Sequence, residues 1–237
     1  MKKIIVVIFS LFFIISCLED PTTEDLSPSS LTQEGWTYFE MAGLNYPVQE
    51  EGYLSKAIEK FELAVYMDVN YADAYNGLGW AYTRVYAVDD AKLHFQIGFN
   101  KASGMLKKEI AIGYSSILLN ENNAEDFEKS RDLLEFVLYG QNIEIYDGEG
   151  RVYDFPDDWF FEHDPVITSL EVHLNYALSL LYTSRNTSSP DGNLMAGNPD
   201  DPINAPSSWG QYNWAVLNAP GGETNTKVQQ LYDLLNN

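Results

Sequence analysis

Basic residues, cysteine and histidine are all scarce in this 237-residue sequence, and each shortage excludes a class of protein. There are 14 Lys and Arg against 35 Asp and Glu, which gives a formal net charge of −21. Nucleic-acid binding needs clustered basic residues, so we expect no nucleic-acid partner. The single cysteine excludes an internal disulfide and a Cys-x-x-Cys metal or redox motif. Three scattered histidines leave little material for histidine-based catalysis.

The apolar run at the start of the chain is too short to cross a membrane. It extends from Ile4 to Ile15 behind Lys2 and Lys3, whereas a spanning helix needs roughly 20 residues. This pattern is typical of a signal peptide. Ile14-Ile15-Ser16-Cys17 resembles the bacterial lipoprotein box, and the resemblance implies that residues 1–16 are removed and that Cys17 is lipidated. The alternative is an ordinary secretory leader with an incidental cysteine.

Residues 17–30 are interpreted as a flexible acidic tether. They contain two prolines, four acidic residues and few apolar ones, too little to offset the entropy of ordering. The acidic residues after Cys17 are similar to export signals of some Bacteroidota lipoproteins. Removal of Lys2 and Lys3 leaves 12 basic against 35 acidic residues, so anionic lipid would repel the body and acyl chains must hold it. We expect a cell-envelope protein, anchored at the outer membrane, on its periplasmic or its surface side.

Internal repetition dominates residues 31–237. Four segments resemble one another, the last only faintly: Gly35–Tyr38, Leu78–Tyr82, Ile112–Ser115 and Leu178–Thr183. The second and third copies are 34 residues apart. The first two are 44 residues apart, which is the same period with a ten-residue insertion. Proline and glycine place that insertion at Asn45–Gly52.

From Asp73 to Gly104 the chain resembles the tetratricopeptide repeat (TPR) family residue by residue. Positions that hold Trp, Leu, Gly and Tyr in the family's first helix, and Ala, Phe and Ala in its second, are here Tyr75, Leu78, Gly79, Tyr82, Ala91, Phe95 and Gly98. The preceding repeat supplies Ala57, Phe61 and Ala64. Small residues let helices approach closely and aromatic ones fill the space between neighbours. Since one hairpin cannot bury its own apolar face, several must stack in series.

We therefore predict an all-α fold, an α-α superhelix of three to four TPR-like helix pairs; the alternative is a helical bundle with chance periodicity. The pairs are expected at about 30–69, 71–103 and 105–139. In the less regular second part we predict a small β-hairpin within 141–155, a helix from Asp164-Pro165 to about Arg185, loop over 186–223 and a short helix over 226–235.

The TPR resemblance also implies a concave groove lined by the first helix of each repeat, which binds proteins or peptides. The residue after the signature glycine faces this groove in the family, and here that residue is aromatic. The predicted partner-binding set is Trp36, Asn76, Trp80, Thr83, Arg84 and Tyr114, with Leu180 in the faint fourth copy. Large rigid rings bury much area at low entropic cost. The alternative is that these aromatics pack between repeats.

A second candidate is the acidic and aromatic stretch from Tyr153 to Asp164. Asp157, Asp158 and Glu162 offer oxygens for Ca²⁺, which would make the protein a calcium-stabilised module, although the spacing does not match an EF-hand loop and solvated acid is the plainer interpretation. We expect two of Trp159, Phe160 and Phe161 to pack against the helices.

No catalytic motif such as His-Glu-x-x-His, Gly-x-Ser-x-Gly or a phosphate-binding loop is present, so we expect neither catalytic residues nor a cofactor. The sequence predicts a non-enzymatic, membrane-anchored TPR scaffold that binds a protein or peptide partner and serves envelope assembly or organisation. The alternative is a cell-surface lipoprotein that binds glycans or nutrients through Trp159 or Trp209. The oligomeric state stays open.

Overall fold

The computed structural model describes residues 26–44, 50–121, 123–140, 154–186 and 208–235. Within these ranges the chain is almost entirely helical, with one small antiparallel hairpin. The elements are α1 (Pro28–Leu44), α2 (Glu50–Met67), α3 (Ala72–Arg84), α4 (Val88–Lys101), α5 (Gly104–Leu119), α6 (Ala124–Tyr139), β1 (Phe160–Phe161), β2 (Asp164–Thr168), α7 (Ser169–Asn186), α8 (Ser208–Asn218), the 3-10 turn η1 (Gly222–Thr224) and α9 (Thr226–Leu235).

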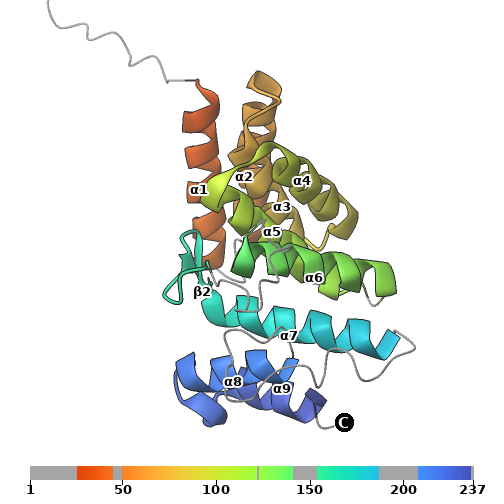
Figure 1. Cartoon of the computed structure of the whole chain (residues 1–237). Coiled ribbons are helices and arrows are strands. Elements are labelled where there is room, and N and C mark those ends of the chain that lie inside the picture. The colour runs from red at the N-terminus through yellow and green to blue at the C-terminus, as the bar shows by residue number, and fades with distance from the viewer. Residues whose placement is uncertain (1–25, 45–49, 122, 141–153, 187–207, 236–237) are drawn as a thin grey trace, which may run out of the picture.

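The helices stack in chain order, and Figure 1 shows the series descending from α1 and α2 to α8 and α9. The three predicted pairs are confirmed as α1–α2, α3–α4 and α5–α6, so the all-α superhelical prediction holds. Pro28 opens α1 inside the stretch assigned to the tether. The first pair has 17- and 18-residue helices against 13 and 14 in the second. Part of the insertion that lengthens the first repeat therefore extends its two helices.

Glycine spacing explains how successive pairs fit together. The ring of Phe61 in α2 lies against Gly35 of α1 and Gly77 of α3, where an added Cβ would come within 2.6 and 2.3 Å of it. Phe95 in α4 has the same relation to Gly79 of α3 and Gly113 of α5, at 2.4 and 2.6 Å. Each phenylalanine of an outer helix therefore occupies space that only glycine leaves between two inner helices.

The second part of the chain differs from the sequence prediction at two places. The helix α7 begins at Ser169 and not at Asp164, because residues 164–168 pair with β1 as a strand. Thr168 caps the helix. Its backbone N–H and its hydroxyl both donate to the carboxylate of Glu171, at 2.8 and 2.6 Å. The hairpin predicted within 141–155 lies almost wholly outside the described residues, and the observed one follows it.

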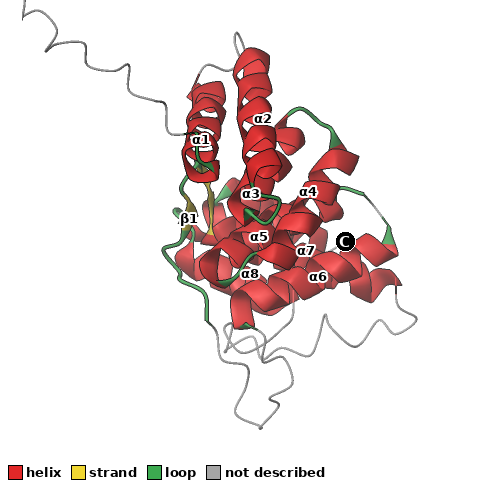
Figure 2. Ribbon diagram, turned by 90° about the horizontal axis from the view of Figure 1, so that it is seen from above, coloured by secondary structure: helices red, strands yellow, loops and turns green. Residues whose placement is uncertain are grey.

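The stretch predicted as loop over 186–223 contains a helix, α8. Trp214 and Ala215 of this helix are buried against α7 and α9, which supplies the packing that composition alone does not reveal. The final helix, α9, has the bounds that were predicted. Figure 2, seen from above, shows the hairpin close to α1 and the C-terminal helices behind the repeats.

Candidate functional site

The inner helices α1, α3 and α5 bring the predicted ladder of aromatic residues together, but not as an open surface. Trp36, Trp80 and Tyr114 are only 4, 6 and 3% exposed. Trp80 packs edge-on against Phe95, and Gly113 leaves room for its indole against α5. The expectation that these rings line an exposed groove is therefore wrong about their exposure. Leu180 of the faint fourth copy is buried in α7 as well.

The cover over Trp36 and Trp80 is the chain's own segment 154–168, which includes the hairpin. Phe161 stacks on Trp80 with ring centroids 4.9 Å apart and meets Trp36 edge-on at 5.7 Å. The imidazole of His163 lies parallel to the indole of Trp36 at 3.8 Å. Figure 1 shows the hairpin at the lower end of α1. A short β-hairpin and the residues before it thus pack on the inner face of the first repeats.

Polar contacts fasten the segment at two places, its hairpin turn and its N-terminal end. Arg84 donates to the carboxylate of Asp164 at 2.7 Å and to the Phe39 carbonyl at 3.0 Å, while its guanidinium lies over the Phe39 ring. His163 pairs with Glu40 of α1 at 2.8 Å. At the other end, Lys108 of α5 donates to the backbone carbonyl of Asp154. Arg84 therefore holds the segment against the repeats.

The remaining predicted residues have internal partners or none. The hydroxyl of Thr83 donates to the Gly79 carbonyl within α3. Tyr114 binds the ammonium group of Lys129 on α6, so its hydroxyl points between helices. Asn76 is 1% exposed, and neither side-chain nitrogen nor oxygen has a hydrogen-bond partner.

Acidic side chains lie around Asn76. Asp73, one turn earlier on α3, accepts from the indole N–H of Trp36 at 3.3 Å, and burial raises the pKa of its carboxyl. Burial, followed by the charges of Asp73 and Glu162, raises the pKa of Glu109 on α5 to about 7. These three carboxyl groups come from α3, α5 and the hairpin turn. The sequence prediction missed Asp73 and Glu109, although Asp73 shares a helical face with Asn76 and Trp80 at a spacing of three and seven residues.

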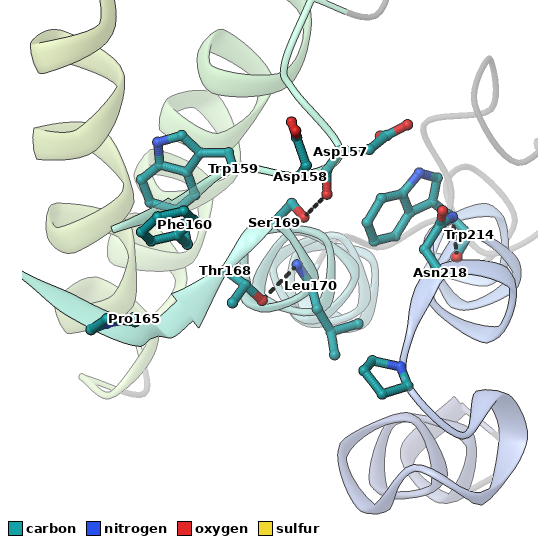
Figure 3. A pocket seen from close by; sticks show the side chains of 11 residues that line it. Asp157, Asp158, Trp159, Phe160, Pro165, Thr168, Ser169, Leu170, Trp214 and Asn218 are labelled. Carbon is teal, nitrogen blue, oxygen red and sulfur yellow. Dashed lines mark hydrogen bonds between the residues drawn. The ribbon is translucent and has the colours of Figure 1, made fainter. Parts of the chain in front are cut away.

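A separate pocket of about 480 Å³ lies between the hairpin and the C-terminal helices. Figure 3 shows Trp159 and Phe160 on one side of it, Trp214 of α8 on the other, and Asp157 and Asp158 near its upper edge. Phe160 is 54% exposed, whereas Phe161 is buried and Trp159 half-buried, as expected of two of these three rings.

Trp214, which lines this pocket, packs on the buried His173 of α7. Their rings stack at 3.5 Å, and the imidazole makes a 2.6 Å hydrogen bond to Gln211. Burial lowers the pKa of His173 to about 4, so this imidazole is neutral near pH 7.

The calcium candidates Asp157, Asp158 and Glu162 do not form a metal site among the described residues, which contain no group of three or more potential protein ligands placed to share an ion. Asp157 and Asp158 precede β1, whereas Glu162 lies in the hairpin turn. Cys17 and the whole leader lie outside the described residues, so lipidation of Cys17 stays a prediction. Within the described part, every helix is too short or too polar to cross a bilayer.

Comparison of the chain with known protein families, with curated proteins and with solved structures found no match. The site must therefore be interpreted from its own chemistry.

Proposed function

We propose that this protein is a non-enzymatic scaffold, lipid-anchored through Cys17 in the cell envelope, that binds a protein or peptide partner along the inner face of its helical repeats. One observation carries the proposal: this face already holds another piece of polypeptide, the hairpin segment 154–168, through stacked rings and an ion pair. A surface that holds the chain's own segment through aromatic and ionic contacts offers the same contacts to a partner's segment in its place.

The energetics favour an aromatic or cationic ligand. Phe161 and His163 contribute ring stacking to the segment, and aromatic pairs are worth about 0.5–1.5 kcal/mol beyond their buried area. The net charge of −21 attracts basic partners over long range. A partner that borrows this face must either replace the segment or extend it toward the carboxyl groups of Asp73 and Glu109.

Peptide display tests the proposal directly. A random library is selected against the immobilised full chain, and enriched peptides are resynthesised with a photo-crosslinker. We expect crosslinks to α1, α3 or residues 154–168. In the Phe161→Ala variant, which loosens the cover, binding should strengthen, whereas the neighbouring Phe160→Ala should leave it unchanged. Failure to enrich any peptide, or crosslinks confined to the outer helices α2 and α4, would exclude this function.

The second candidate is a glycan- or nutrient-binding lipoprotein, and the pocket of Figure 3 favours it. Aromatic faces beside carboxylates suit a sugar, because rings pack on its C–H groups while carboxylates accept its hydroxyls. Screening oligosaccharides on a glycan array, followed by titration calorimetry, tests this function. Trp159→Ala should abolish binding and Tyr86→Ala, at a 90% exposed residue of the α3–α4 loop, should not. A chain that binds no oligosaccharide, or one indifferent to Trp159→Ala, rejects it.

A further inference from the structure

Unpartnered buried polar atoms concentrate on the inner helices. Among the described residues, the buried side-chain atoms without a hydrogen-bond partner are Thr32 Oγ1, Asn76 Nδ2 and Oδ1, and Trp80 Nε1. All of them belong to α1 or α3. Buried polar atoms nearly always have a partner, so each exception needs a physical explanation. Two of these residues, Asn76 and Trp80, are one helical turn apart on the same face of α3.

The same face carries a carboxylate with spare capacity. Asp73 is three residues before Asn76, and both of its oxygens accept from one donor, Trp36 Nε1. A carboxylate has about four acceptor positions, so most of them are left. Asn76 lowers the pKa of Asp73 although its amide does not reach hydrogen-bonding geometry, so the two groups are neighbours.

Glu109 completes the arrangement from α5. Gly113, one turn after Glu109 on α5, lies against the indole of Trp80, which is itself one turn after Asn76 on α3. The charges of Asp73 and Glu162 also raise the pKa of Glu109. Among the described groups that act on the pKa of Asp73 or Glu109, only His163 is a cation when protonated, and it already pairs with Glu40. The nearby Lys108 and Arg84 are bound to Asp154 and Asp164. Asp73 therefore shares the charge of His163 with Glu40, and no described cation acts on the pKa of Glu109.

We propose that Asp73, Asn76 and Glu109 form a binding site for an ammonium or guanidinium group, supplied by a lysine or arginine side chain of the partner. This inference rests on the proposed function, and it names the chemistry of the partner at that face. An organic cation offers several N–H donors to Asp73, Glu109 and Asn76 Oδ1 at once. A metal ion fits less well, since the described carboxyl groups do not converge closely enough to share one.

The titration of Glu109 gives the site a testable signature. The titratable groups that face it are Asp73 of α3 and Glu162 of the hairpin turn, both acidic. A bound cation favours the ionised carboxylate, so cation affinity should rise as the pH rises through about 7. A site built on neutral hydrogen bonds would show no such dependence.

The experiment is calorimetric titration of the full chain with the peptide Ac-Gly-Arg-Gly-Lys-Gly-NH₂, its double-glutamine counterpart and 1,4-diaminobutane. We expect the basic peptide alone to bind well and its affinity to rise severalfold from pH 6 to pH 8. Glu109→Gln should weaken it by roughly tenfold, the scale of one charge-assisted hydrogen bond, and remove the pH dependence. Glu59→Gln, at an exposed position of α2, removes the same charge and should change affinity less than twofold.

Several results would overturn the inference. These are equal binding of the basic and glutamine peptides, equal effects of Glu109→Gln and Glu59→Gln, or a basic peptide that does not bind while diaminobutane does. Circular dichroism controls for folding of both variants. The display selection could also yield neutral peptides that bind Glu109→Gln and the unmodified chain equally well. That result would overturn this inference and leave the proposed function standing. The basic peptide could instead bind in a way that depends on Glu109 while the display selection enriches no peptide. That result would count against the proposed function alone.

Discussion

Replacing Phe161 by alanine should cost far more stability than replacing its neighbour Phe160, although the two residues are chemically identical and adjacent. Phe161 is 1% exposed and lies among Trp80, Trp36 and His163, with ring centroids between 4.9 and 5.7 Å away. Truncation of a fully buried phenylalanine costs about 3–5 kcal/mol. Phe160 points the other way along the strand and is 54% exposed, so its loss should cost about 1 kcal/mol or less.

Urea unfolding followed by circular dichroism measures the difference. With a denaturant dependence of about 2.5 kcal/mol per M, the Phe161→Ala midpoint should fall by about 1–2 M, and that of Phe160→Ala by at most about 0.4 M. The fluorescence of the folded Phe161→Ala variant should also shift to the red, because Trp36 and Trp80 lose their cover. Equal midpoints for the two variants would refute the view that residues 154–168 are part of the core of the repeats.

Three further predictions concern the packing and the buried titratable groups. Gly77→Ala should destabilise the chain by about 1–3 kcal/mol in urea unfolding, because the new Cβ would lie 2.3 Å from the Phe61 ring. Gly52→Ala is the control: its Cβ meets no atom within 4 Å, and it should stabilise the chain by up to about 1 kcal/mol. A stabilising Gly77→Ala would contradict the packing described. His173 has a folded pKa of about 4 against 6.5 when unfolded, so stability should fall as the pH drops from about 6.5 to 4, and His173→Gln should flatten this slope in pH-dependent thermal melts. The pH dependence of stability due to Glu109 has the opposite sign: its pKa is raised from 4.5 to about 7 in the folded chain, so its contribution to stability is lost as the pH rises across that interval. Thermal melts at pH 8 should therefore give Glu109→Gln a higher Tm than the unmodified chain. An unchanged Tm would be evidence against a perturbed carboxyl group.

Repetition made the first half of the fold predictable. The spacing of Gly79 from Gly113, and of Phe61 from Phe95, fixes which helices can approach and what fills the space between them. Such information is local and recurs every 34 residues, so a short pattern determines each pair. The helix bounds followed from the same pattern to within a few residues.

The cover over the inner face was not predictable in this way. Phe161 meets Trp36 across 125 residues of chain, and nothing in its local sequence distinguishes it from Phe160. The start of α7 was mispredicted for a related reason: Asp164-Pro165 has the composition of a helix start, but Arg84 takes the Asp164 side chain. A local signal did exist three residues on, since Thr168 and Glu171 have the spacing of a capping box.

The order in which the chain is made gives the covering segment one more consequence. All three repeat pairs are synthesised before Phe161 and His163, so an unfinished chain presents the indoles of Trp36 and Trp80 without these two covering rings. Chaperones and proteases would meet repeats with uncovered aromatic rings during that interval. Covering of the inner face therefore waits until residues 161–164 have been made, and a premature stop before them would yield a chain that aggregates although its three repeat pairs are intact.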